Sequence, residues 1–292
     1  MLRNGSSECG GEPFHAMRET SKLVARSDEV GETGRTILLR HGGRTARVCL
    51  LLHGLTASPP QFAEFGRLLY ERGANVLIPA LPRHGHADRL SNVLEGLNRD
   101  ELVEFSRRAL DEARQHGERV TVIGFSLGGL LALWIGQHES VERVVAIAPF
   151  LGIRWLPDAL GPLAAALTLR LPNKWLWWNP FERERQMPAH GYPRYPTHAV
   201  AQSYHLAREL IGDARTTPPA TNDIVLVVND SEMAVRNRST RRLAVSWEAH
   251  QTARIAIHRL RGLPPSHDVI EPLRAPKIVA RIYPELIDLA DS

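Results

Sequence analysis

Cysteine is nearly absent from this chain of 292 residues, which contains only Cys9 and Cys49. Two cysteines do not make a disulfide framework, so small disulfide-stapled folds are excluded and a cytoplasmic location is expected. The chain also lacks the run of about eighteen consecutive apolar residues that a transmembrane helix needs. We therefore expect no stable insertion into a membrane.

Charge of one sign does not dominate the sequence. Lys and Arg number 36 against 32 Asp and Glu, which gives a formal net charge of +4 at pH 7. The positive residues are mostly Arg, scattered along the chain with short clusters such as Arg241-Arg242. This pattern is typical of a solvated basic surface and not of a nucleic-acid groove, so no nucleic-acid partner is expected. The oligomeric state stays open.

A strand followed by Gly-Phe-Ser-Leu-Gly is the most informative stretch that the chain does contain. Residues 120–123 are β-branched and predict a buried strand, and residues 130–135 predict an apolar helix. A Ser between a strand and a helix, with Gly on each side, is the pattern of a nucleophile elbow. A side chain at either Gly would collide with a neighbouring element, whereas the Ser126 hydroxyl stands clear. We therefore predict that Ser126 is a nucleophile.

A serine nucleophile needs a base, and the base needs an acid that orients it. In folds with this elbow the chain order is Ser, then Asp or Glu, then His. Of the thirteen histidines, His267 follows the last predicted strand and is predicted to be the base. The acid is expected in the loop at residues 229–235, which offers Asp230 and Glu232. Residue type favours Asp230, but position favours Glu232, which we predict to be the acid with Asp230 as the alternative; the other carboxylate is expected to cap the next helix.

An oxyanion hole needs two backbone N–H groups that point at the developing negative charge. The N–H of Leu127, directly after the predicted nucleophile, is one candidate. The other is expected in the loop that begins at His53-Gly54, after a strand that ends at residue 52. There the N–H of Leu55 is the best candidate.

Strands alternate with helices along most of the chain, which predicts an α/β fold with a mostly parallel central sheet covered on both faces. Residues 1–34 are polar, lack the apolar stretch of a signal peptide, and are expected to form a partly disordered extension with a possible short helix at 16–25. Residues 35–149 and 223–292 are expected to form the core. Residues 36–40 and 46–52, joined through Gly42-Gly43, predict a β-hairpin.

The alternation stops between residues 150 and 222, a stretch rich in proline that carries Trp155, Trp175, Trp177 and Trp178. We expect it to form a helical cap over one edge of the sheet. Each tryptophan by itself is most simply part of the cap's own core. Together they favour an apolar ligand, and Met233 is placed to line the same pocket.

Four segments together resemble bacterial carboxylesterases and monoacylglycerol lipases of the α/β-hydrolase superfamily. They are Leu-Leu-His-Gly-Leu-Thr-Ala-Ser-Pro, Leu-Pro-Arg-His-Gly-His, Gly-Phe-Ser-Leu-Gly-Gly and Ser-His-Asp-Val-Ile, and the resemblance covers roughly residues 35–150 and 223–290. It implies an α/β-hydrolase fold with a cap, no cofactor, and hydrolysis of a small hydrophobic ester. Its triad would be Ser126, His267 and either Glu232 or Asp230, with Leu55 and Leu127 at the oxyanion hole.

The sequence departs from these relatives at two places. Ala57 stands where they usually carry Gly, which changes the freedom of the loop. The acid loop is Asn-Asp-Ser-Glu and not a clear Gly-x-x-Asp, which leaves the acid open between Asp230 and Glu232.

Three alternatives compete with a serine esterase. His84, His86 and Asp88 match most of a zinc-hydrolase motif, but Arg89 occupies the position of its last His, so a metal is not expected. Some proteins of this fold bind small molecules without turning them over. Thioesterases, acyltransferases and amidases use the same acyl-enzyme chemistry, and no motif here separates them from esterases.

Overall fold

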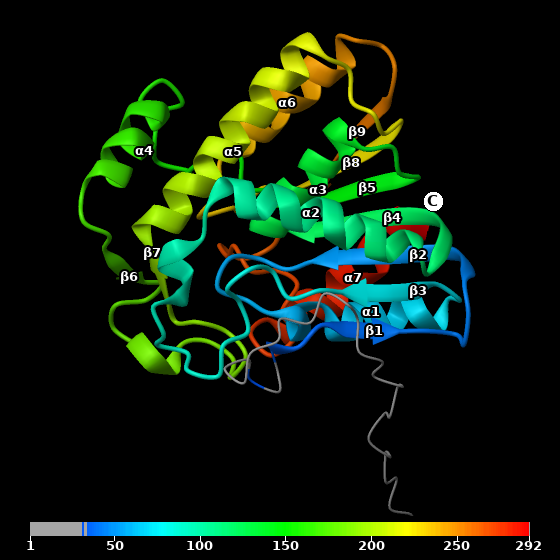
Figure 1. Cartoon of the computed structure of the whole chain (residues 1–292), viewed down its shortest axis with the longest axis horizontal. Coiled ribbons are helices and arrows are strands. Elements are labelled where there is room, and N and C mark those ends of the chain that lie inside the picture. Colours follow the sequence, from blue (N-terminus) through cyan, green and yellow to red (C-terminus); the bar gives the residue numbers. More distant parts are fainter. Residues whose placement is uncertain (1–30, 32–33, 292) are drawn as a thin grey trace, which may run out of the picture.

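The computed structural model describes residues 31 and 34–291. Nearly all of the predicted polar extension, with the possible helix at 16–25, lies outside the described residues. The described part contains a seven-stranded sheet of order β1-β3-β2-β4-β5-β8-β9 (Figure 1). Its strands are β1 (Ile37–Leu39), β2 (Thr45–Leu52), β3 (Asn75–Ile78), β4 (Gly117–Phe125), β5 (Arg143–Ile147), β8 (Asp223–Asn229) and β9 (Arg254–Leu260). Neighbours in this sheet are parallel except for β1 and β3.

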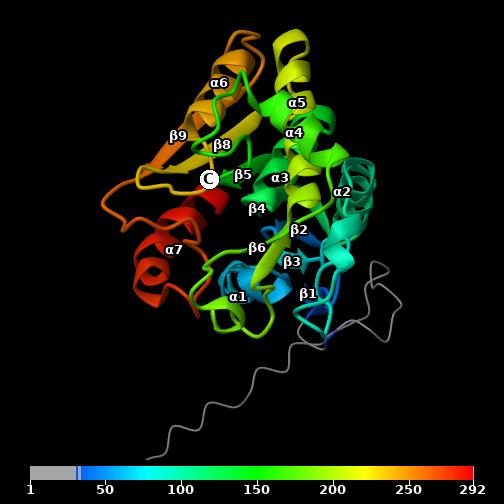
Figure 2. The same cartoon turned by 90° about the vertical axis from the view of Figure 1, so that its left-hand side faces the viewer.

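Helices cover both faces of the sheet, so the predicted α/β fold is confirmed (Figures 1 and 2). The helices on one face are α1 (Ala63–Glu71) and α7 (Pro276–Asp291), and those on the other are α2 (Arg99–Arg114), α3 (Leu127–His138), α5 (Thr197–Thr216) and α6 (Asn237–Glu248). Among the described residues, every helix is too short or too polar to span a membrane.

Strand β2 is an interior strand of the sheet, between β3 and β4, and is buried on both faces, as its continuous apolar run predicts. Val48, Leu50 and Leu52 enter one core, while Cys49 and Leu51 enter the other. Burial raises the pKa of the Cys49 thiol to about 12, so this cysteine stays protonated and packs as a small apolar residue. The strand ends at the carboxyl edge of the sheet, so the loop after Leu52 begins there.

The predicted hairpin between the first two strands is wrong. β1 pairs antiparallel with β3, and β3 lies between β1 and β2. The connecting loop crosses the start of β3, where the buried side chain of Asn75 accepts a hydrogen bond from the His41 N–H (2.8 Å) and donates one to the Gly43 carbonyl (2.7 Å). Gly42-Gly43 therefore belongs to a loop around a third strand and not to a hairpin turn.

Residues 150–222, where the alternation is predicted to stop and a helical cap to form, contain several regular elements. They include helix α4 (Gly161–Arg170) and an antiparallel pair of short strands, β6 (Trp175–Trp177) and β7 (Arg194–Pro196). The alternation then resumes at α5, well before residue 222, and α5 packs against α2, α3 and α6 over the sheet. Helix α5 therefore belongs to the helical layer over the sheet, and small alanines form much of its buried face.

Candidate active site

Ser126 lies at a sharp turn between β4 and α3. Its backbone adopts a left-handed φ of 55°, a conformation that costs a non-glycine residue about 1–3 kcal/mol. Three backbone hydrogen bonds hold it: Ser126 N–H donates to Ile147 (3.0 Å), and its carbonyl accepts from Leu130 (3.0 Å) and Phe150 (2.9 Å). The surrounding structure thus stabilises the strained turn.

Both glycines of the turn are required by close backbone contacts, as the sequence predicts. A Cβ at Gly124 would lie 2.0 Å from the Gly128 carbonyl oxygen, and a Cβ at Gly128 would lie 1.9 Å from the Leu52 carbonyl oxygen. The first oxygen belongs to helix α3 and the second to the end of strand β2, and neither can move without disturbing the element that contains it. The turn therefore fixes where the Ser126 side chain lies.

His267 lies in the loop after β9 and bridges two of the other predicted residues. Its Nε2 is 2.8 Å from Ser126 Oγ and its Nδ1 is 2.9 Å from Glu232 Oε1. Since a carboxylate only accepts, Nδ1–H donates to Glu232 and Nε2 is left to accept from the serine hydroxyl. The Asn229 side chain donates to the Ser266 carbonyl (2.8 Å) and ties this loop to the end of β8.

Glu232 is fully buried and accepts hydrogen bonds at one oxygen from several donors. Besides His267, the N–H groups of Met233 (2.8 Å) and Ala234 (2.7 Å) donate to Oε1. Burial acts to raise the pKa of this carboxyl. The His267 hydrogen bond and charge, together with the backbone donors, outweigh burial and hold the pKa below its ordinary value. Glu232 is therefore ionised at neutral pH.

Asp230 lies outside this chain of hydrogen bonds. It forms a two-point ion pair with Arg259 of β9, with Nε–Oδ1 and Nη2–Oδ2 distances of 3.0 and 2.9 Å. The parallel register of β8 with β9 pairs Val228 with Arg259, two residues before Asp230, so the long Arg259 side chain is within reach of the Asp230 carboxylate. The expectation that the second carboxylate caps the next helix is wrong for Asp230, because α6 has no side-chain cap.

The two predicted oxyanion donors, Leu55 and Leu127, line the same cavity as Ser126 and His267. The Leu127 N–H is at the first residue of α3, where a helix leaves its N–H groups unpaired. The Gly54 carbonyl accepts from His53 Nδ1–H (3.0 Å) and from the Ala57 N–H (3.1 Å). Described peptide bonds are trans, so the Leu55 N–H points away from that carbonyl. In the described part of the chain, neither donor bonds to a protein acceptor.

An apolar cavity of about 200 Å³ opens beside Ser126. Met233 lines it as predicted, and so do Trp155 and Trp178. Trp175 and Trp177 do not line it. The remaining lining residues are also mostly apolar or aromatic, and they are Phe150, Ile153, Tyr195, Val200, Ser203, Ala234 and Val235.

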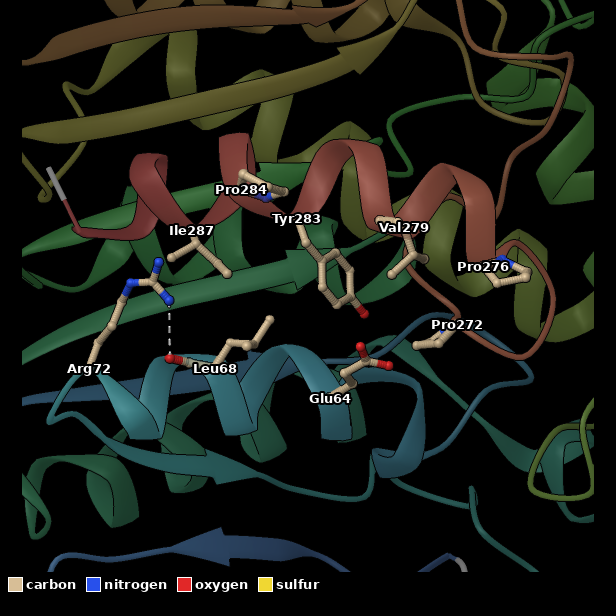
Figure 3. Close-up of a pocket in the computed structure, with 10 residues that line it drawn as sticks. Glu64, Leu68, Arg72, Pro272, Pro276, Val279, Tyr283, Pro284 and Ile287 are labelled. Carbon is tan, nitrogen blue, oxygen red and sulfur yellow. Dashed lines mark hydrogen bonds between the residues drawn. The ribbon is translucent and has the colours of Figure 1, made fainter. Parts of the chain in front are cut away.

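A second hollow, of about 380 Å³, lies between α1 and α7 (Figure 3). Glu64 and Arg72 provide its charged side chains, and the hydroxyl of Tyr283 donates to the Ile270 carbonyl (2.8 Å). None of the predicted site residues lines it. Its residues offer no nucleophile with an adjacent base, unlike those of the cavity beside Ser126.

Two buried histidines, whose part in the site the sequence did not reveal, hold the loop at residues 53–57, which we call the oxyanion loop. His53 Nε2 accepts from the Leu81 N–H (3.1 Å), and His84 Nε2 accepts from the Thr56 N–H (3.3 Å). Burial, with a smaller contribution from the charge of His84, lowers the pKa of His53 well below its ordinary value. Burial also lowers the pKa of His84 to about 4, so both rings are neutral acceptors. The His-Gly pairs at 53–54 and 84–85 are the signal that sequence reasoning could have used.

The contacts of His84 also concern the alternative of a zinc site, which the sequence offers at His84, His86 and Asp88. His84 Nδ1 is 2.7 Å from the Pro82 carbonyl, so both ring nitrogens are engaged with backbone groups. This ring offers no free lone pair to a metal. Among the described residues, no three His, Cys, Asp or Glu side chains cluster as a metal site would require.

Stability is expected to fall between pH 6.5 and 4 because of His84. An unfolded histidine binds its proton near pH 6.5, whereas His84 in the folded protein binds it only near pH 4. Acid therefore favours the unfolded state, and the loss amounts to roughly 3 kcal/mol once the pH reaches 4. Urea unfolding of the wild type and of His84→Gln at several pH values measures it. Equal slopes of unfolding free energy against pH in the two proteins would contradict this prediction.

Comparison with known proteins agrees with the architecture. A mostly parallel sheet with a serine at a strand–helix elbow is the arrangement of α/β hydrolases. The model of the Alpha/beta hydrolase family matches residues 49–281, and the chain belongs to this family. No curated protein matches the sequence.

Several solved structures resemble this chain. One, described as "LipS and LipT, two metagenome-derived lipolytic enzymes", has a TM-score of 0.66 and 13% identity over 90% of this chain and 100% of that one. A monoacylglycerol lipase of Paleococcus ferrophilus has a TM-score of 0.66 and 18% identity over 88% and 99%. A soluble variant of monoglyceride lipase from Saccharomyces cerevisiae, in complex with a substrate analogue, has a TM-score of 0.62 and 10% identity over 88% and 91%. At these identities the likeness shows the fold.

Proposed function

We propose that this hydrolase cleaves carboxylic esters of apolar acyl groups through an acyl-enzyme on Ser126. The observation that carries the proposal is the continuous chain of hydrogen bonds from Ser126 through His267 to the buried Glu232, at the wall of an apolar cavity. A serine held this way is an activated nucleophile, which a protein that only binds a ligand does not need. The lipase and esterase relatives of similar fold support the same class of substrate.

Each residue has a role in the proposed reaction. His267 Nε2 removes the proton of Ser126 as Oγ attacks the ester carbonyl carbon, and the N–H groups of Leu55 and Leu127 stabilise the oxyanion. Glu232 holds the imidazole in the required tautomer and stabilises its protonated form. The protonated His267 gives its proton to the leaving alcohol, and water activated by the same His267 then hydrolyses the acyl-enzyme.

The site as proposed needs no metal or cofactor. Neutral imidazole, ionised carboxylate and backbone N–H groups provide every proton transfer and charge stabilisation in the two half-reactions. We also propose that the enzyme is located in the cytoplasm. The free, buried thiol of Cys49 supports this location.

A series of p-nitrophenyl esters of increasing acyl length tests the substrate class. We expect kcat/KM to rise about fourfold per methylene, because each buried methylene contributes about 0.8 kcal/mol, until the cavity is filled. The steady-state rate constants from acetate to decanoate measure this rise. A flat series, or a preference for the charged succinyl ester over butyrate, would contradict an apolar acyl pocket.

A further inference from the structure

Thr56 is the most constrained residue of the oxyanion loop. It is 1% exposed and has a left-handed φ of 66°, which a β-branched residue rarely adopts. Its N–H donates to His84 Nε2 and its carbonyl accepts from the Tyr192 N–H at 2.7 Å. Its Oγ1 accepts from the indole Nε1–H of Trp178 at 2.8 Å. Each of its polar atoms is therefore held by a different segment of the chain.

The conformation of Thr56 bears directly on the predicted oxyanion donor. The Leu55 N–H belongs to the Gly54–Leu55 peptide, whose carbonyl is fixed by His53. That carbonyl also accepts from the Ala57 N–H at 3.1 Å, which closes a turn in which Thr56 precedes Ala57. Because a peptide group is planar, the Leu55 N–H turns with the Gly54 carbonyl, and the backbone conformation of Thr56 keeps the Ala57 N–H on that carbonyl. The direction of that donor thus depends on the contacts of Thr56.

Trp178 contacts this loop from the insert, one residue after β6. Its ring lines the cavity and packs against Tyr195, with ring centroids 4.3 Å apart, although the side chain as a whole is 39% exposed. Its backbone N–H donates to the Pro193 carbonyl at 3.2 Å, which fixes the main chain from which the indole extends. The indole is thus held on its ring face and at its backbone, with its N–H directed at Thr56 Oγ1.

We propose that Trp178 is a positioning residue for ester hydrolysis and that it acts through Thr56 on the direction of the Leu55 N–H. The inference rests on the proposed function, since it concerns stabilisation of the oxyanion formed at Ser126. Trp178 makes the insert part of the oxyanion machinery as well as a wall of the pocket. A donor that is held in place before the reaction stabilises the oxyanion without reorganisation, so the contact affects kcat more than substrate binding.

Thr56→Val and Trp178→Phe remove the two ends of this hydrogen bond and leave the shapes largely intact. We expect each variant to lower kcat for p-nitrophenyl acetate about three- to tenfold, the size of one neutral hydrogen bond, with KM within about twofold of the wild type. Thr56→Ser keeps the hydroxyl and is expected to retain wild-type kcat. The double variant is expected to lose no more than either single variant, because both remove the same bond.

Trp177→Phe is the matched control, since Trp177 is the neighbouring β6 residue and does not line the cavity. It is expected to keep wild-type kcat, and thermal unfolding of all variants checks their folding. Wild-type kcat in Thr56→Val and Trp178→Phe would overturn the proposal. Equal losses from Trp178→Phe in the wild-type and Thr56→Val backgrounds would also overturn it, because the ring would then act by contacting substrate.

The same experiment separates this inference from the function on which it rests. If Ser126→Ala keeps the wild-type rate, the proposed function fails. If Ser126→Ala is inactive while Thr56→Val and Trp178→Phe are fully active, only the positioning role of Trp178 fails.

Discussion

Ser126→Ala is expected to lower kcat for p-nitrophenyl esters by four to six orders of magnitude, on the order of what removal of a triad serine costs elsewhere. Alanine fits the space and removes only the oxygen that we propose forms the acyl-enzyme. What activity is left would come from the oxyanion donors and the pocket, which still bind and polarise the ester. Initial rates with p-nitrophenyl butyrate measure the loss.

The control for this prediction is Ser106→Ala. Ser106 is a buried serine of α2 whose hydroxyl bonds to the Leu102 carbonyl, away from the cavity. It is expected to retain wild-type activity and to be labelled by a fluorophosphonate probe, as the wild type is. Retained turnover in Ser126→Ala would refute the assignment, and a wild-type protein that is never labelled at Ser126 would favour a binding protein over an enzyme.

Glu232→Gln is expected to lower kcat by about three to four orders of magnitude. Since Oε1 accepts from the Met233 and Ala234 N–H groups as well as from His267, the amide oxygen takes its place and the NH₂ group takes the place of Oε2. His267 then keeps its Nδ1–H hydrogen bond but loses the negative charge that stabilises its protonated form. The loss thus comes from the missing charge in a site whose geometry is otherwise kept.

Asp230→Asn is the comparison that decides which acid acts. It weakens the ion pair with Arg259, whose side chain is 46% exposed, so both kcat and stability should change little. Activity and thermal unfolding of the two variants are measured side by side. The reverse pattern, with Asp230→Asn inactive and Glu232→Gln active, would reject Glu232 as the orienting acid.

The elements that the sequence predicts well are those whose determinants are local. Asn98 caps α2 by accepting from the Glu101 N–H (3.0 Å), which the sequence indicates at a spacing of three residues. The Ser126 elbow depends on glycines two residues to either side. Such short-range patterns can be read without knowledge of the rest of the fold.

The features that the sequence misses depend on partners far along the chain. Gly42-Gly43 is typical of a hairpin turn. In the structure β3 lies between β1 and β2, and Asn75 of β3 bonds to the Gly42-Gly43 loop, so the two strands do not form a hairpin. Asp230 and Glu232 are two residues apart, and residue type favours the first whereas position favours the second. Arg259 draws Asp230 away from His267, and that arginine lies on the neighbouring strand. Pairing between strands is decided by the whole sheet, so local pattern leaves it open.

The Asp230–Arg259 ion pair lies at β9, the edge strand of the sheet. Strand β9 is the last strand in the order, so one side of its backbone has no neighbouring strand within the sheet. Along it, Arg254 pairs with Asp223, His258 lies 3.0 Å from Glu285, and Arg259 pairs with Asp230. Charged side chains on an edge strand disfavour the addition of a strand from another molecule. Asp230, the carboxylate that does not contact His267, thus helps to protect the sheet against aggregation.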